Sequence, residues 1–399
     1  MASPYRFDRM ELAGSLGDLG TLLPLALGMV LINGLHPGGL LLSIGLFYVL
    51  SGGYFKVTVP VQPMKVIGAY AVATGIGAPQ ILASGFLMGV MLLLIGASGA
   101  MTLIGRYTPR AVIRGVQLST GVLLLSQGVK LMLGTSRYQV LQQVAEPYLR
   151  VQSLGPLPLG ILIGVTGSLL TLLLLENRKL PAGLLVVFGG LAVGLLLGTR
   201  EGLSGLHVGL HFPAILPFGF PSGADFTFAV FALVLPQIPM TLGNAVIAYV
   251  DLSQEYFGNE SRKLTYRSAC LSMGVANLSS FMFGGMPLCH GAGGLAAHYR
   301  FGARTAGSNV LIGVLFVVMA TFLGNQAIGV VKLLPMAVLG VLLVFAGSQL
   351  ALTITDLEDR KGFFVALIML GITLASSLAY GFMAGLFLAH VLKSDKLKV

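Results

Sequence analysis

Two segments of this sequence combine helix-breaking residues with polar groups in apolar surroundings. In the first, VTVPVQPMKVIGAYAVATG, Pro60 and Pro63 disfavour helix as far as Met64, because proline lacks an N–H and restricts the residue before it. A helix that begins at Met64 or Lys65 would present unpaired backbone N–H groups and the positive end of its dipole, which together form an anion site. The Lys65 ammonium and the Gln62 amide would add further donors. The alternative is that Lys65 lies near the membrane interface and extends its amine to water.

The second segment, FGGMPLCHGAGGLAAHYRFGART, has the same character. Its glycines and Pro287 break the chain, and helix resumes near His290 or Gly291, where small residues let the backbone approach a ligand closely. His290 can hydrogen-bond an anion or carry a proton, and the alternative is a histidine whose ring is satisfied by packing partners. Two broken helices with opposed N-termini would place two sets of backbone donors around one point. We therefore predict a site for a tetrahedral dianion between them.

A carboxylate falls in the segment GSLGDLGTLLPLALG. Asp18 and Thr21 lie three residues apart there and so share one face of the expected helix. Thr21 can donate a hydrogen bond to an anion. Ionised Asp18 would repel the anion, whereas protonated Asp18 can donate to it, which makes Asp18 the candidate for proton coupling. The alternative is that Asp18 caps a helix or lies at the cytoplasmic interface.

Polar side chains also interrupt the apolar segment LPQIPMTLGNAVIAY. Gln237, Thr241 and Asn244 follow at spacings of four and three, again on one helical face. Such side chains within an apolar span are costly unless they have partners. Gln237 and Asn244 carry amide donors suited to an oxyanion, and hydrogen bonds between packed helices are the alternative. The predicted substrate-binding set is therefore Thr21, Gln62, Met64, Lys65, Gln237, Thr241, Asn244, His290 and Gly291.

The composition indicates what must position these residues. Of 399 residues, 55% are hydrophobic and 10% are charged, and the mean hydropathy is +0.90, which excludes a soluble domain and predicts an all-α polytopic membrane protein. Two cysteines leave no room for a disulfide framework or a four-cysteine metal site, so we expect no metal and no cofactor. The net charge of +10 is scattered between hydrophobic stretches, which is typical of membrane topology and not of nucleic-acid binding. The N-terminus does not resemble a signal peptide.

Allowing about 20 residues per crossing, the sequence predicts about fourteen membrane spans. We expect them near 10–33, 38–55, 60–76, 80–104, 111–134, 155–175, 181–199, 224–250, 266–283, 287–299, 305–323, 327–352, 362–377 and 379–393. With the N-terminus in the cytoplasm, most arginines and lysines then fall in inward loops, in agreement with the positive-inside rule. We therefore expect both termini in the cytoplasm, and a bacterial inner (plasma) membrane as the location.

A polar stretch at 200–223 divides the single transmembrane domain, 1–399, into halves at 10–199 and 224–394. An odd number of spans in each half turns the second half upside down, which predicts seven-plus-seven inverted repeats with one broken half-helix in each. Weak similarity between PLALG in the first span and PMTLG in the eighth span agrees with this arrangement.

Four ordered motifs, GDLGTLLPLALG, PVQPMK, PQIPMTLGNAV and MPLCHGAGGLAAHYRFGART, resemble the molybdate transporter family (type 1), a branch of the sulfate permease superfamily. The later stretch LLPMAVLGVLLVFAG is also similar to sulfate permeases. The resemblance implies a core domain of spans 1–4 and 8–11, a gate domain of the other spans, and substrate held between the half-helices of spans 3 and 10. It also implies that the regulatory cytoplasmic domain of many sulfate permeases is absent, and that a homodimer can form through the gate domain.

The sequence thus favours a secondary transporter of molybdate, with proton coupling as a further hypothesis; its expected partners are a small inorganic oxyanion and the lipid bilayer. Sulfate and tungstate, which are also tetrahedral dianions, are the nearest alternative substrates. A nucleobase symporter is disfavoured because no carboxylate lies between Leu235 and Tyr249. Two other classes are an anion channel of the same fold and an intramembrane enzyme built from Cys289, His290 and Asp18. The enzyme is disfavoured because no nucleophile motif accompanies these residues.

Overall fold

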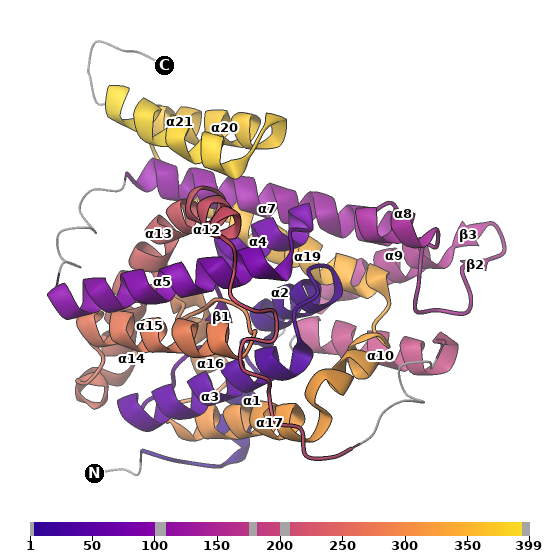
Figure 1. Cartoon of the computed structure of the whole chain (residues 1–399), viewed down its shortest axis with the longest axis horizontal. Helices are drawn as coiled ribbons and strands as arrows, with labels where there is room; N and C mark the ends of the chain where they lie inside the picture. The colour runs from indigo at the N-terminus through magenta and orange to yellow at the C-terminus, as the bar shows by residue number, and fades with distance from the viewer. Residues whose placement is uncertain (1–3, 100–108, 175–181, 200–207, 393–399) are drawn as a thin grey trace.

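The computed structural model describes residues 4–99, 109–174, 182–199 and 208–392, and these are mostly helical (Figure 1). In the first half the elements are α1 (Arg9–Ser15), α2 (Leu19–Leu31), α3 (Pro37–Phe55), β1 (Gln62–Pro63), α4 (Lys65–Thr74), α5 (Ala78–Ser98), α7 (Arg110–Leu133), α8 (Arg137–Gln142), β2 (Ser153–Leu154), β3 (Leu157–Pro158), α9 (Leu159–Leu174) and α10 (Ala182–Leu197). In the second half they are α12 (Gly223–Phe228), η1 (Ala229–Val234), α13 (Leu235–Met240), η2 (Thr241–Ala248), α14 (Tyr249–Phe257), η3 (Gly258–Ser261), α15 (Tyr266–Met282), β4 (Leu288–Cys289), α16 (Ala292–Arg300), α17 (Gly307–Leu323), η4 (Gly324–Gln326), α18 (Ala327–Val331), α19 (Met336–Ala351), η5 (Leu352–Asp356), α20 (Arg360–Ala375) and α21 (Leu378–Val391).

Six helical stretches of the described residues are long and apolar enough to cross a membrane, and shorter apolar helices accompany them. The six are Pro37–Phe55, Ala78–Ser98, Arg110–Gln142, Gly223–Ser261, Gly307–Val331 and Met336–Asp356. Two predicted spans are not continuous helices. The stretch 10–33 is divided between α1 and α2, and the stretch 327–352 is interrupted before α19, where Pro335 restricts the residue that precedes it.

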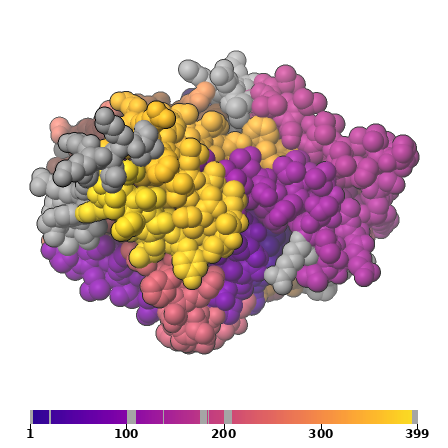
Figure 2. All heavy atoms as spheres, turned by 90° about the horizontal axis from the view of Figure 1, so that it is seen from above, coloured from indigo at the N-terminus to yellow at the C-terminus, as the bar shows by residue number. Residues whose placement is uncertain are grey.

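The helices pack in two groups. In the first group α3 lies against α17 and α5 lies against α15, while in the second α7 contacts α19, α20, α21 and α9. Figure 2 shows α20 and α21 (yellow) on the surface of the second group, beside the region of α7 to α9. Glycine permits the close approach of the paired helices: a β-carbon on Gly45 would lie 2.7 Å from Gly313 O, and one on Gly128 would lie 2.6 Å from Gly340 O. Larger residues at these positions would push α3 from α17 and α7 from α19.

The two predicted chain breaks are confirmed, and they lie side by side. Strands β1 and β4 pair antiparallel, with Gln62 opposite Cys289 and Pro63 opposite Leu288. On α15 the Asn277 carboxamide fixes this pair, because Nδ2 donates to Leu288 O at 2.7 Å and Oδ1 accepts from Leu288 N at 3.0 Å. Helices α4 and α16 both begin directly after the pair, each preceded by a residue in extended conformation. The pairing therefore brings two helix N-termini together from opposite halves of the chain.

The predicted regular span at 224–250 contains two π-helical segments, η1 and η2, on either side of α13. Pro236 and Pro239 lie between them, and each lacks the N–H that a regular helix would use while its ring crowds the carbonyl four residues earlier. Wider π turns accommodate such a defect. The wider turn changes the angular positions of Thr241 and Asn244 from those that they would have in a regular helix.

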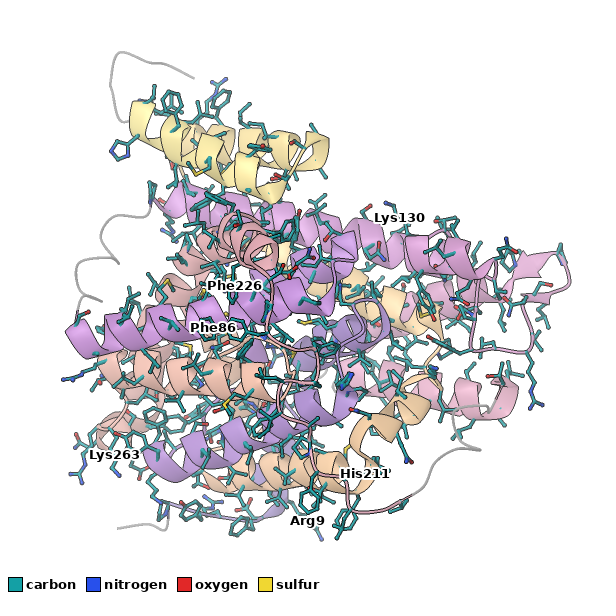
Figure 3. The ribbon with its side chains drawn as sticks, viewed as in Figure 1. Arg9, Phe86, Lys130, His211, Phe226 and Lys263 are labelled. Carbon is teal, nitrogen blue, oxygen red and sulfur yellow. The ribbon has the colours of Figure 1, made fainter. Side chains whose placement is uncertain are left out.

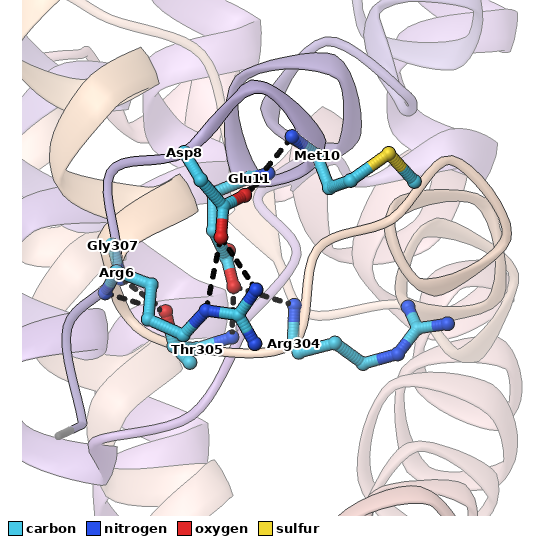
Figure 4. A network of polar contacts seen from close by, with 7 residues as sticks. All are labelled: Arg6, Asp8, Met10, Glu11, Arg304, Thr305 and Gly307. Carbon is cyan, nitrogen blue, oxygen red and sulfur yellow. Dashed lines mark hydrogen bonds and ion pairs between the residues drawn. The ribbon is translucent and has the colours of Figure 1, made fainter. Parts of the chain in front are cut away.

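The N-terminal segment ties down the loop that follows α16 (Figure 4). The buried carboxylate of Glu11 accepts hydrogen bonds from Arg304 N at 3.1 Å and Thr305 N at 3.0 Å. Thr305 Oγ1 in turn accepts from Arg6 N at 3.1 Å. These bonds hold the far end of α16, so that both of its ends are fixed by segments distant in sequence.

Candidate functional site

The first turn of α16 holds backbone donors that lack an acceptor. Gly291 precedes the helix in extended conformation, and the first helical hydrogen bond runs from Leu295 N to Gly291 O at 3.0 Å. Within the described residues no acceptor contacts the amides of Ala292, Gly293 or Gly294. Gly293 is exposed. Three converging amides at the positive end of a helix bind an anion.

The first turn of α4 is closed by a side chain. Gln237 Oε1 accepts from Val66 N at 3.0 Å and from Ile67 N at 3.2 Å. Met64 N donates to Pro287 O at 2.9 Å, and the Met64 side chain is fully buried. The prediction of free amides at this helix start is therefore wrong for these three residues. Residues distant in sequence accept hydrogen bonds from these amides, which would have no partner in an isolated helix.

A cation and an amide flank the start of α16. Lys65 is half-buried, and its Nζ lies 4.0 Å from the position that a β-carbon on Gly293 would occupy. Asn244 is also half-buried, and its Nδ2 lies 3.6 Å from the corresponding position on Gly291. The structure thus places Lys65 and Asn244, two of the predicted ligands, beside the first turn of α16.

A buried carboxylate and carboxamide lie beneath the same turn. Gln62 Nε2 donates to Asp18 Oδ1 at 2.7 Å, and both side chains are buried. A β-carbon on Gly291 would overlap Gln62 Oε1, and one on Gly294 would overlap Asp18 Oδ2. Gln62 Oε1 has no hydrogen-bond partner among the described residues. Asp18 precedes α2 at the break after α1, so the prediction that it shares a continuous helix with Thr21 is wrong, and the Thr21 side chain lies outside the described residues.

Three predicted ligands instead have partners inside the protein. His290 Nδ1 lies 2.8 Å from Pro60 O and its Nε2 lies 3.1 Å from Ser272 Oγ, so this buried ring links the two broken segments and does not face the open turn. Gln237 Nε2 donates to Thr241 Oγ1 at 2.9 Å. The amide donor that we assigned to the substrate at Gln237 is therefore engaged by Thr241.

Two glycines that complete the site lie in the run of small residues predicted to approach a ligand, but were not among the predicted ligands. The predicted ligand was Gly291, whereas the exposed donor next to Lys65 is Gly293 and the residue that contacts Asp18 is Gly294. The signal was present in the run GAGG, because consecutive small residues at a helix start allow close approach at every position. Asn277, which holds β4, gave no such signal.

Solved structures show the class of protein to which this fold belongs. The chain is similar to the structure of SLC26A9, with a TM-score of 0.65 and 13% identity over 96% of this chain, and it spans 65% of the length of that chain. It is also similar to the transmembrane domain of a cyanobacterium bicarbonate transporter, BicA, with a TM-score of 0.62 and 15% identity over 94% of this chain and 97% of that one. The chain therefore shares the fold of SLC26A9 and of the BicA transmembrane domain.

Sequence comparison then identifies the family. A family model described as "Molybdate transporter of MFS superfamily" matches residues 10–124 and 229–350. Molybdate transporter 1 of Arabidopsis thaliana is 31% identical over 97% of this chain and 89% of its own length, and Molybdate transporter 1 of Chlamydomonas reinhardtii is 30% identical over 94% and 90%. The chain belongs to the molybdate transporter family, as its motifs predicted. It is a multi-pass membrane transporter and not an enzyme.

Proposed function

We propose that this protein carries molybdate across the membrane as a secondary active transporter, with the start of α16 as the binding site. The observation that carries the proposal is that three amides without acceptors among the described residues lie beside Lys65 and Asn244. Molybdate is a tetrahedral dianion whose oxygens accept several hydrogen bonds at once. The names of the relatives support molybdate as the substrate.

In this proposal Gln237 keeps the second half of the site closed until substrate arrives. Its Oε1 lies where an anionic oxygen would contact the amides of Val66 and Ile67. Rotation of the carboxamide away from α4 opens this helix start to a second molybdate oxygen. The two helix N-termini then hold the dianion from opposite sides, with one lysine and no second cation.

Asp18 and Gln62 provide a route for proton coupling. While Asp18 is ionised, Gln62 Nε2 donates to it and Gln62 Oε1 is turned toward Gly291, where an acceptor repels an oxyanion. When Asp18 takes up a proton, its hydroxyl donates to Gln62 Oε1, and the reversed carboxamide offers Nε2 to the substrate. Proton binding and anion binding then favour each other.

The larger movement in this proposal takes place between the two packing groups. The group of α3, α5, α15 and α17 carries the site as a core, and the group of α7, α9 and α19–α21 serves as a gate. We propose seven-plus-seven inverted repeats across the two halves, with both termini in the cytoplasm, as the positive-inside rule favours. Accessibility of single cysteines, placed in the basic loops of a variant lacking Cys270 and Cys289, tests the orientation.

Uptake into proteoliposomes tests the substrate and the site. We expect purified protein to take up labelled molybdate, with stronger competition from tungstate than from sulfate. Lys65→Met should weaken molybdate binding about tenfold to a hundredfold, the value of a hydrogen bond to a charged group. Lys332→Met, which removes an exposed lysine on the loop before α19, serves as the control. Unchanged molybdate binding by Lys65→Met would rule out this site. Equal competition by sulfate would show that the substrate is tetrahedral oxyanions in general and not molybdate in particular.

A separate variant tests the coupling. The carboxamide that Asp18→Asn introduces cannot ionise, so binding should become independent of pH and match the affinity of the native protein at acidic pH. Uptake driven by a proton gradient should be lost while exchange of labelled for unlabelled molybdate persists. If Asp18→Asn keeps the native pH dependence, the proton is carried elsewhere.

A further inference from the structure

An apolar groove runs between α3 and α15 on the outside of the first packing group. It encloses about 370 Å³, and its walls include Leu46, Phe47, Leu50, Tyr54, Leu271 and Val275. Leu50 and Val275 are more than half exposed, at 64% and 55%. Ser43, which also lines the groove, donates to Gly39 O within its own helix and so offers no free donor. Exposed aliphatic walls on a membrane protein face the acyl chains of lipids.

One end of the groove is basic. Lys263 Nζ lies 5.5 Å from the centre of the Tyr54 ring, and Ser268, another residue of the groove, donates to Lys263 O. Figure 3 shows Lys263 at the edge of the molecule, beyond the start of α15. Lys263 makes no ion pair with any residue that the structure describes. Arg262 and Arg267 are exposed on either side of it, and the acidic residues of the same region are Glu255, Glu260 and Asp251, of which Asp251 accepts a hydrogen bond from Tyr266 Oη at 2.6 Å.

We propose that this groove binds an anionic phospholipid of the surrounding bilayer, independently of the transported substrate. One acyl chain lies between α3 and α15, and the phosphate lies against Lys263 and the edge of Tyr54. Charge complementarity selects the lipid, because basic residues at a membrane surface attract anionic headgroups. The acyl chain also reaches Ser272, whose hydroxyl lies 3.1 Å from His290 Nε2.

The chain contains no tryptophan, which makes a direct test possible. Leu50→Trp places a single fluorophore in the groove, and Val318→Trp places one on an exposed position of α17 as the control. Each variant is reconstituted in vesicles of phosphatidylcholine that contain a minor fraction of brominated phosphatidylglycerol or, separately, the same fraction of brominated phosphatidylcholine. Bromine quenches the fluorophore only on contact, so the difference between the two lipids measures selectivity at that position.

We expect quenching of Leu50→Trp to show that phosphatidylglycerol binds the groove about fivefold more tightly than phosphatidylcholine does. This ratio is the contribution expected from one basic residue at a membrane surface. Val318→Trp should show no preference. Adding Lys263→Gln to Leu50→Trp should abolish the preference while leaving quenching by phosphatidylcholine unchanged.

Two results would overturn the proposal. Equal quenching of Leu50→Trp by both lipids would show that the groove holds bulk lipid without selection. Quenching by neither lipid, with normal quenching of Val318→Trp, would show that the groove is covered by protein, for example a second copy of the chain.

Discussion

Replacing Gly293 with alanine separates binding from stability at the proposed site. A β-carbon at this position meets only Lys65 Nζ, at 4.0 Å, so Gly293→Ala introduces no clash. The methyl group does fill the space between the ammonium and the start of α16. An oxygen that contacts both the Gly293 N–H and Lys65 needs this space. We therefore expect the loss of at least one hydrogen bond to a charged group, which weakens molybdate binding about tenfold to a hundredfold.

Stability should change in the opposite direction. Alanine restricts the unfolded chain more than glycine does, which stabilises a helix by about 0.5–1 kcal/mol. Gly371→Ala on α20 is a matched control, because its added β-carbon also meets no clash: no atom lies within 4 Å of it. Both variants should unfold at slightly higher temperature than the native protein, and only Gly293→Ala should lose affinity.

The assay is a binding isotherm for labelled molybdate on purified protein, combined with thermal unfolding in the same detergent. An affinity of Gly293→Ala within about twofold of the native value, with unfolding equal to that of Gly371→Ala, would refute the placement of the anion at α16. A large loss of stability in Gly293→Ala alone would show that the turn is packed more tightly than the structure indicates.

Three further changes test other parts of the reasoning. Gln237→Glu places a carboxylate on the start of α4, where the helix dipole stabilises it but the charge repels substrate, so we expect higher thermal stability and at least about tenfold weaker molybdate binding near neutral pH. Glu146, in the loop after α8, accepts from Met336 N and Ala337 N at 2.8 Å each, and burial raises its pKa from 4.5 to about 7. Between these two pH values the folded protein keeps the Glu146 proton, whereas the unfolded chain has released it. The free energy of unfolding should therefore fall by at most about 3 kcal/mol as the pH rises through this window. Glu146→Gln should remove this pH dependence, as measured by thermal unfolding at a series of pH values. Cys289→Ser should retain full molybdate uptake. Loss of uptake in this variant would show that turnover requires the Cys289 thiol.

The positions of the two chain breaks could be predicted because their cause is local. Pro60 and Pro63 exclude regular helix wherever they occur, and Gly291 with its small neighbours permits an extended segment followed by a helix start. Membrane residence was equally predictable, since it follows from the composition of the whole chain. The helical face of Gln237, Thr241 and Asn244 was a weaker prediction, because two prolines change the turn from regular to π-helical geometry.

A membrane-embedded helical chain with two interrupted helices follows from the residues alone, and the motifs are enough to identify the family. Which of the two helix starts remains open depends on the packing of the folded chain. Both starts carry unpaired amides as isolated helices, but Gln237 reaches across from α13 to satisfy those of α4, while no described residue satisfies those of α16. Hydrogen-bond partners distant in sequence are fixed by packing between helices, and local propensity contains no information about them.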